Sequence, residues 1–280
     1  MQAGISTLKL TGLAGEHLHV TCWERPEVAG ILLLIPGKND HGGRYEELAE
    51  QVSTVGWGVW GLDLRGQGRS FGPPAQVDRF HEFLEDVEIA VQAIRTRYPH
   101  RPIVLVGYSM GAAVAVEYCA QHPEKVSGLI GVSPCFCIEN RLTWWMPPTL
   151  QVLDWLLPHF ILSRSYNPLA VTRDLEQQRR IASDPYMDGT TRARLIMELR
   201  RAAKRCLNVA NRIELPVLTL ISPSDRIVDP TAAEAFHRDL PGNATICRYP
   251  GLRHDLLHEE GREAVFRDIC VWLAQVWSHA

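Results

Sequence analysis

The sequence lacks any long hydrophobic run. Apolar stretches such as 31–35 extend for only a few residues, whereas a membrane-spanning helix needs about 20. The first 20 residues also lack the continuous apolar centre of a signal peptide, because Lys9, Glu16 and His17 interrupt them. These absences predict a soluble, cytoplasmic protein.

Lysine and arginine are present but are nowhere gathered into a basic run. They number 29 against 32 aspartate and glutamate residues, and the formal net charge is −3. Non-specific binding to nucleic acid depends on a basic stripe or patch. The sequence therefore argues against a nucleic-acid partner, and nothing in it indicates an oligomeric state.

The seven cysteines lack the spacing of a metal site. Their number is odd, and Cys135 and Cys137, which alone lie close together, form Cys-x-Cys rather than a zinc-ribbon pair. Free, mostly buried thiols in a reducing compartment fit this scatter. We therefore expect no bound metal.

Short apolar runs alternate with helix-periodic segments along most of the chain. Non-alternating apolar runs are typical of strands buried on both faces, and strands alternating with helices predict a parallel sheet covered on both sides. After a hairpin over 6–23, the expected strands are 30–35, 58–64, 103–106, 126–132, 217–221 and 245–249. The expected helices are 45–55, 80–98, 110–121, 231–239 and 262–277. The fold class is therefore α/β, with a mostly parallel sheet of eight strands.

This rhythm stops after Pro134 and resumes near residue 207. The segment between is mostly helical by its periodicity and contains several prolines. We call residues 135–206 the insert. The predicted organisation is a core formed by 1–134 and 207–280, interrupted by this helical insert.

A glycine-flanked serine lies between one expected strand and the next helix. The sequence Gly107-Tyr-Ser109-Met-Gly111 has the Gly-x-Ser-x-Gly pattern, in which small flanking residues allow a tight turn that presents the serine. The free N–H groups of the helix beginning near Met110 favour a developing negative charge. The strand-before, helix-after context predicts that Ser109 is a nucleophile.

A serine hydroxyl needs a general base, and two histidines follow at the right place in the chain. His254 lies on a loop just past an expected strand, where it can face the nucleophile, whereas His258 is expected in a helix. For the acid that holds the base, Asp225 directly follows a strand. The alternative, Asp229, precedes a proline and is better placed to cap a helix. We predict Ser109, Asp225 and His254 as the catalytic residues.

Several stretches resemble the monoacylglycerol lipase and lysophospholipase branch of the α/β-hydrolase superfamily, which includes serine aminopeptidase S33-type hydrolases. They are the loop 37–45, the turn 62–70, the serine turn, and the segments 225–230 and 251–259. The resemblance implies the α/β-hydrolase fold, in which the insert is a helical cap over the site. It also implies hydrolysis of an ester without a cofactor.

By this resemblance, the backbone N–H groups of Lys38 and Met110 form the oxyanion hole. Two donors near the developing oxyanion are what acyl transfer requires. The loop departs from the family pattern at Pro36 and Asn39, and the turn departs from it at Gln67. The alternative for Lys38 is a solvated loop residue.

The insert is rich in apolar side chains. The stretches 142–148 and 152–162 contain tryptophan, phenylalanine and many leucines. They are expected either to line an acyl-binding tunnel with a lip that contacts membranes or micelles, or simply to pack the insert onto the core. The basic segment 192–205 is interpreted as a solvated helix face, with attraction to anionic headgroups as the alternative.

The predicted activity is hydrolysis of a carboxylic ester through an acyl-enzyme on Ser109. The substrate is a small or lipidic ester, with a monoacylglycerol or lysophospholipid favoured. The alternatives are a peptidase or amidase on the same fold, and a non-catalytic binding protein that has kept it.

Overall fold

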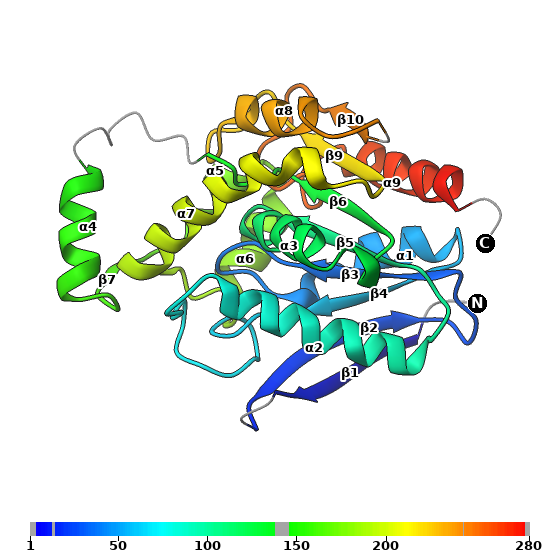
Figure 1. Cartoon of the computed structure of the whole chain (residues 1–280), viewed down its shortest axis with the longest axis horizontal. Helices are drawn as coiled ribbons and strands as arrows, with labels where there is room; N and C mark the ends of the chain where they lie inside the picture. Colours follow the sequence, from blue (N-terminus) through cyan, green and yellow to red (C-terminus); the bar gives the residue numbers. More distant parts are fainter. Residues whose placement is uncertain (1–3, 13–14, 138–145, 243, 278–280) are drawn as a thin grey trace.

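The computed structural model describes residues 4–12, 15–137, 146–242 and 244–277. Within these ranges eight strands form one sheet, in the order β1-β2-β4-β3-β5-β6-β9-β10 (Figure 1). The strands are β1 (Gly4–Thr11), β2 (His17–Glu24), β3 (Gly30–Ile35), β4 (Trp57–Leu62), β5 (Ile103–Tyr108), β6 (Gly128–Val132), β9 (Val217–Ile221) and β10 (Ala244–Arg248). β2 is antiparallel to both of its neighbours, and the other pairs are parallel. The predicted eight-stranded, mostly parallel sheet is confirmed.

The central strands are apolar at every position because both of their faces are buried. In β3, Ile31 and Leu33 contribute to one hydrophobic cluster, whereas Leu32 and Leu34 contribute to the other. Successive side chains of a strand point to opposite faces. A strand that lies between two cores must therefore be apolar throughout, which explains the non-alternating runs.

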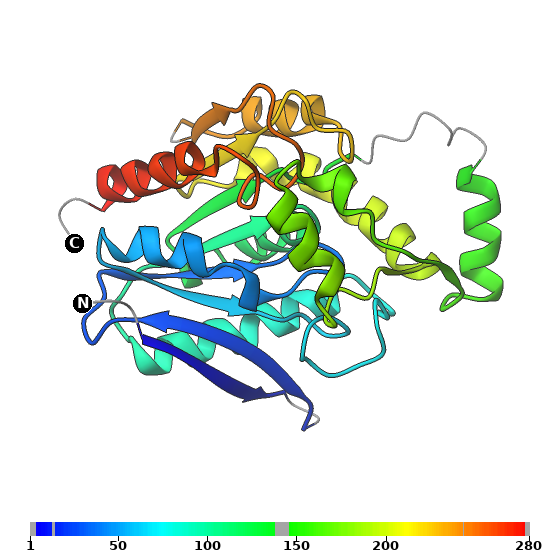
Figure 2. The same cartoon turned by 180° about the vertical axis from the view of Figure 1, so that it is seen from behind.

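Helices cover both faces of the sheet. On one face lie α2 (His81–Arg97), α3 (Met110–Gln121) and α8 (Pro230–Arg238), whose buried side chains share one cluster. On the other face lie α1 (Glu46–Ser53) and α9 (Arg262–Val276), which Figure 2 shows in front of the strands. Three short 3₁₀ helices complete this part: η1 (Gly42–Arg44), η2 (Pro123–Lys125) and η3 (Ala210–Arg212).

The chain between β6 and β9 contains more than helices. Its elements are α4 (Met146–Leu156), β7 (Ile161–Arg164), α5 (Pro168–Val171), α6 (Leu175–Ser183), β8 (Thr190–Arg192) and α7 (Ala193–Val209). β7 and β8 form a two-stranded antiparallel ribbon that the sequence periodicity did not predict. α4 stands at one end of the molecule (Figures 1 and 2), and α7 runs from it back to the core. α7 crosses the predicted boundary at residue 206 and buries Leu199, Ala202 and Cys206 in the main cluster.

All seven cysteines are free thiols. Cys22, Cys119, Cys135 and Cys206 are buried, and Cys137 is exposed. Burial raises the pKa of Cys119 and of Cys135 to about 12, so both are neutral thiols at physiological pH. In the part of the chain that is described, no helix is both long and apolar enough to cross a membrane.

Candidate active site

Ser109 occupies a strained turn between β5 and α3. Its φ of 53° and ψ of −114° are unusual for a residue with a side chain. A Cβ on Gly107 would lie 2.4 Å from the Cα of Ala112, and one on Gly111 would lie 2.0 Å from the carbonyl oxygen of Ile35. Glycine is therefore required on both sides of the serine, and the strain presents its hydroxyl.

The three predicted catalytic side chains meet at this turn. His254 Nε2 lies 2.9 Å from Ser109 Oγ, and His254 Nδ1 lies 2.7 Å from Asp225 Oδ2. His254 is 3% exposed and Asp225 is 6% exposed, so little water competes for these hydrogen bonds. The arrangement is a chain of nucleophile, base and acid in hydrogen-bonding contact.

Asp225 is held by the loop that follows β9. Its Oδ1 accepts hydrogen bonds from the backbone N–H groups of Ile227 and Val228, at 2.8 and 3.2 Å. These bonds leave Oδ2 for His254. Asp229 instead caps α8, where its side chain accepts a hydrogen bond from the N–H of Thr231 at 2.9 Å. The structure thus brings Asp225 to His254 and leaves Asp229 at the start of α8.

Neighbouring groups fix the position of His254. Its carbonyl oxygen accepts a 2.7 Å hydrogen bond from Ser133 Oγ, and its ring lies against Tyr108, with centroids 5.3 Å apart. His258 does not face Ser109, since its ring nitrogens contact Asp255 Oδ1 at 2.9 Å and the carbonyl oxygen of Arg44 at 3.1 Å. The expectation that His258 lies in a helix is wrong, because it belongs to a turn that precedes α9.

His258 belongs to a second buried network beside the site. Burial alone would raise the pKa of Asp255, but the charge and hydrogen bond of His258 and the charge of Arg44 lower that pKa to about 2. Arg44 also forms a 2.9 Å ion pair with Asp40, and Tyr45 donates a 2.5 Å hydrogen bond to the same carboxylate. This network joins the loop after β3 to the loop that carries His254.

The loop after β3 lies directly on the serine turn. A Cβ on Gly37 would lie 3.3 Å from the Cβ of Ser109. The next residue is Lys38, and Met110 directly follows the serine on the other side. Among the described residues, neither of their backbone N–H groups has a protein acceptor. Both amides are therefore available to a ligand near Ser109.

Two of the residues that depart from the family pattern, Asn39 and Gln67, hold the backbone of this loop. Asn39 has a φ of 60°, in the left-handed region that asparagine tolerates better than most residues. Its N–H donates to Gln67 Oε1 at 2.6 Å. Asp63 accepts hydrogen bonds from the N–H groups of Gly42 and Arg69 at 2.7 and 2.8 Å. The turn at 62–70 thus positions the loop that carries Lys38.

Two side chains of this loop contact the insert, and sequence patterns did not reveal their partners. Lys38 Nζ donates a 2.8 Å hydrogen bond to Thr191 Oγ1 on β8, and His41 Nε2 lies 2.8 Å from Asp184 Oδ2 just after α6. These contacts join residues more than a hundred positions apart. No local pattern could have indicated them, because they depend on how the insert packs.

The eight-stranded sheet, with a serine on the turn between β5 and α3, defines an α/β-hydrolase. A profile of the serine aminopeptidase S33 family matches residues 26–261. The chain belongs to this family, and it is a hydrolase.

Known relatives agree with this class. The chain is 27% identical to the monoglyceride lipase homolog of Monkeypox virus, over 96% of this chain and 98% of that protein. It is 28% identical to the monoglyceride lipase of Homo sapiens, over 95% and 89%. A solved structure of a soluble variant of monoglyceride lipase from Saccharomyces cerevisiae, in complex with a substrate analog, has a TM-score of 0.82 at 24% identity, covering 99% of this chain and 96% of that one. The predicted resemblance to this branch is confirmed.

Proposed function

We propose that the protein is a carboxylic-ester hydrolase that cleaves lipid esters of the monoacylglycerol or lysophospholipid type. The observation that carries this proposal is the contact of Ser109 with His254 and of His254 with Asp225. The monoglyceride lipases among its relatives support an ester substrate with an acyl chain. No cofactor is needed for this reaction.

In the proposed reaction, His254 Nε2 takes the proton of Ser109 as Oγ attacks the ester carbonyl carbon. Asp225 holds the imidazole in the required tautomer and stabilises the imidazolium. The imidazolium then protonates the leaving alcohol as the carbon–oxygen bond breaks. Water, deprotonated by His254, attacks the acyl-enzyme and releases the carboxylic acid and the free serine.

The backbone N–H groups of Lys38 and Met110 are the proposed oxyanion donors. Their support is that both amides flank Ser109 and lack a protein acceptor within the described residues. Met110 also begins α3, so the partial positive charge of a helix N-terminus points at the same place. Losing one such donor typically lowers kcat by about 10²–10³-fold.

The nucleophile is tested by labelling with a fluorophosphonate, followed by peptide mass spectrometry. We expect an adduct on Ser109 in the wild type and none in Ser109→Ala. His254→Gln should slow labelling strongly, whereas the matched variant His258→Gln should slow it far less, because His258 does not contact Ser109. Folded wild-type protein without an adduct at Ser109 would refute the proposal.

The substrate class is tested with a panel of p-nitrophenyl esters of rising chain length, beside aminoacyl anilides. We expect ester hydrolysis that improves with chain length and little anilide hydrolysis. Preferential hydrolysis of the anilides would establish the peptidase alternative instead. Labelled Ser109 without turnover of either series would favour the non-catalytic binding alternative.

We also propose that the insert, 135–206, acts as a cap on a core formed by 1–134 and 207–280. Its support is the pair of contacts from the loop at 37–45, namely Lys38 with Thr191 and His41 with Asp184. Part of the apolar stretch 142–148 lies outside the described residues. The acyl tunnel expected there therefore stays a prediction.

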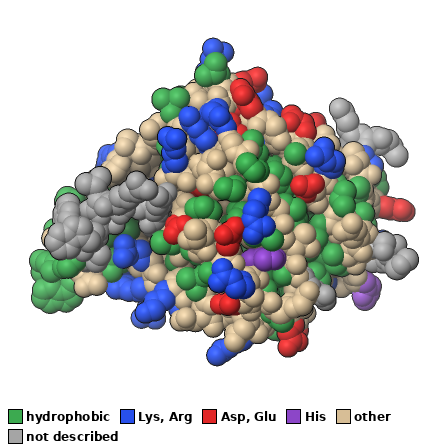
Figure 3. Space-filling view, turned by 90° about the horizontal axis from the view of Figure 1, so that it is seen from above, with side chains coloured by type: hydrophobic (Ala, Val, Ile, Leu, Met, Phe, Trp, Pro, Cys, Tyr) green, Lys and Arg blue, Asp and Glu red, His purple; other side chains and the backbone are tan. Residues whose placement is uncertain are grey.

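The outer side of α4 is the proposed contact with membranes or micelles. Trp155 is 79% exposed, although tryptophan is usually well buried. Other exposed apolar side chains on or near α4 are Val152, Leu156, Leu157, Phe160 and Leu162. Figure 3 shows hydrophobic side chains gathered at this end of the molecule, next to lysine and arginine side chains. An exposed apolar patch beside basic residues fits a lipid surface.

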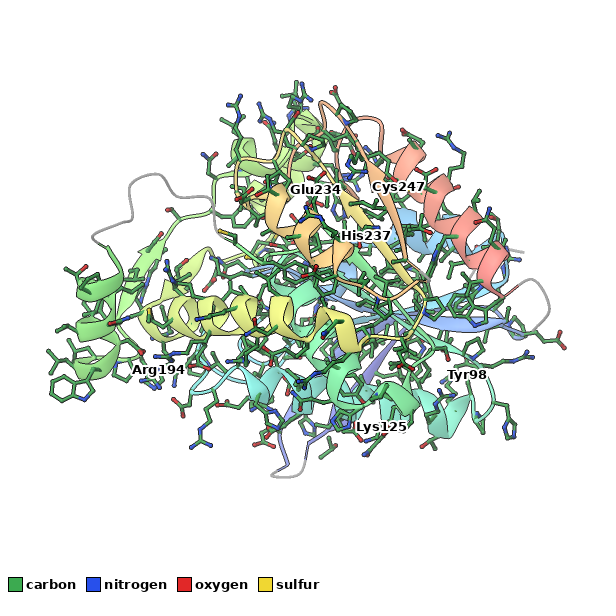
Figure 4. All side chains as sticks on the ribbon, turned by 45° about the horizontal axis from the view of Figure 1, so that its top comes forward. Tyr98, Lys125, Arg194, Glu234, His237 and Cys247 are labelled. Atoms are coloured by element: carbon green, nitrogen blue, oxygen red, sulfur yellow. The ribbon has the colours of Figure 1, made fainter. Side chains whose placement is uncertain are left out.

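The inner side of α4 is tied to α7. Arg194 Nε donates a 2.5 Å hydrogen bond to Asp154, and Arg201 lies 3.6 Å from the same carboxylate. Figure 4 shows Arg194 on the side of α7 that faces α4. Asp154 is itself buried. These contacts hold α4 so that Trp155 and its apolar neighbours face outward.

Sedimentation with phosphatidylcholine vesicles containing phosphatidylglycerol tests the membrane contact. The triple variant Trp155→Ser, Leu156→Ser, Leu157→Ser should bind about 100-fold more weakly, if each side chain contributes about 1 kcal/mol. The control, Ile5→Ser with Val271→Ser, removes exposed apolar side chains elsewhere and should bind like the wild type. Equal binding by the triple variant would refute the contact.

The predicted cytoplasmic location remains a proposal. Its support is the set of seven free cysteines, since oxidising compartments favour disulfides.

A further inference from the structure

The Lys38 side chain lies between the serine turn and the insert. Its backbone follows Gly37, which packs on Ser109, and its Nζ reaches Thr191 on β8. The half-buried lysine side chain therefore bridges the loop beside Ser109 and β8 of the insert.

Few of the described protein groups offset the positive charge of this ammonium group. It carries three N–H donors, and within the described residues its hydrogen-bond partner is the neutral Thr191 hydroxyl. Asp188 is the nearby acid that attracts it. Both oxygens of that carboxylate already accept hydrogen bonds from Thr190, at 2.9 and 2.8 Å, and no ion pair joins Asp188 to Lys38.

A link between the loop and the insert does not require a charge. A neutral side chain could bond to the Thr191 hydroxyl without the free-energy penalty of removing an ammonium ion from water. The charge needs a partner that the described protein does not supply. A substrate bound at Ser109 would place one within reach of the four-carbon lysine stem.

Building on the proposed function, we propose that the Lys38 ammonium binds an anionic group of the substrate close to the scissile ester. The group is a phosphate on the alcohol side or a carboxylate on the acyl side. Either oxyanion can accept charge-assisted hydrogen bonds from the two N–H donors that have no partner among the described residues. Lys38 would then have two separate roles, with its backbone N–H at the oxyanion and its side chain selecting the substrate.

The pH behaviour of the group agrees with this role. Burial lowers the pKa of Lys38 from 10.5 to about 8, although the negative charge of Asp188 opposes this shift. The ammonium is therefore charged at pH 7 and loses its charge above pH 8, and any preference for anionic substrates should weaken over the same range.

The test compares kcat/KM for three soluble esters that share a glycerol alcohol and a six-carbon acyl chain. They are 1-hexanoylglycerol, 1-hexanoylglycerol 3-phosphate, and the glycerol monoester of adipic acid, which carries its carboxylate on the acyl side. The measured quantity is the ratio of each anionic ester to the neutral one, so general damage to the loop cancels. We expect Lys38→Met to lower one ratio at least tenfold, and the ester affected identifies the side on which the anion lies.

Two further variants separate charge from tethering. Lys38→Arg should retain most of the ratio, because it keeps the charge. Thr191→Val should also retain it, because it removes the tether and leaves the ammonium. An unchanged ratio in Lys38→Met, or an equal loss in Thr191→Val, would overturn the proposal.

A binding measurement separates this inference from the proposed function. Calorimetry with the ether analogues 1-hexylglycerol and 1-hexylglycerol 3-phosphate, and with the matching carboxylate ether, needs no turnover. If the wild type hydrolyses none of the esters, the proposed lipid-ester activity fails. The Lys38 proposal then stands or falls on whether Lys38→Met selectively weakens binding of an anionic ether.

Discussion

Replacing Lys38 with methionine should stabilise the fold, even though it removes a hydrogen bond. The wild-type protein holds a half-buried ammonium group that has one neutral hydrogen-bond partner among the described residues, and its partial removal from water is the main reason its pKa is lowered. Methionine has a similar length, is flexible, and carries no charge to remove from water. The prediction is a larger free energy of unfolding at neutral pH.

The magnitude follows from the pKa. It falls from 10.5 to about 8, and each pKa unit corresponds to about 1.36 kcal/mol, so the buried charge costs about 3 kcal/mol below pH 8. The lost bond to Thr191 offsets about 1 kcal/mol. We therefore expect Lys38→Met to gain about 2 kcal/mol at pH 7.

The sign of the pH dependence is fixed by the lowered pKa. Between pH 8 and 10.5 the unfolded chain keeps the lysine proton and the folded protein loses it, so the wild type gains stability relative to the variant as pH rises. Urea unfolding of both proteins at pH 7 and pH 9.5 measures this. A variant that is no more stable at pH 7, or a difference that does not shrink at pH 9.5, would refute the reasoning.

Four other substitutions test the site and its surroundings. Asp225→Asn should lower kcat by about 10⁴-fold, whereas Asp229→Asn should leave kcat unchanged and alter stability by no more than about 1 kcal/mol at the α8 cap. Gly111→Ala places a Cβ 2.0 Å from a backbone oxygen, so fluorophosphonate labelling should fall sharply, and labelling at the normal rate would contradict the packing. The Asp255 carboxylate, with its lowered pKa, contributes stability above pH 4 that is lost as pH falls toward 2, so the deficit of Asp255→Asn should narrow over that range in urea titrations.

The core of this fold was predictable because its signals are local. Strands buried on both faces give continuous apolar runs such as 31–35. The backbone packs so closely at positions 107 and 111 that only glycine fits there, so the sequence around Ser109 contains recognisable glycines. The loop carrying Asp225 follows such a strand, β9, whereas the loop carrying His254 follows the partly exposed edge strand β10. The parallel topology then brings the ends of these strands to one edge of the sheet.

The insert was harder to predict because long-range packing decides its structure. The β7–β8 ribbon is short, and its strands pair across about thirty residues, so periodicity gives no warning of it. The hydrogen-bond partners of Lys38 and His41 could not be predicted from the sequence for the same reason. No local sequence pattern marks these two side chains. Their contacts form only when the folded insert brings Thr191 and Asp184 next to them.

Two residues that hold the loop beside Ser109 differ from the sequence pattern of the family. Asn39 keeps a left-handed backbone where the family has glycine, and Gln67 supplies the acceptor that holds it. In this chain the backbone path is therefore specified by a torsional preference at Asn39 and a hydrogen-bond acceptor on Gln67. A search that scored torsional preference and hydrogen-bonding capacity would find distant relatives that a search for identical residues discards.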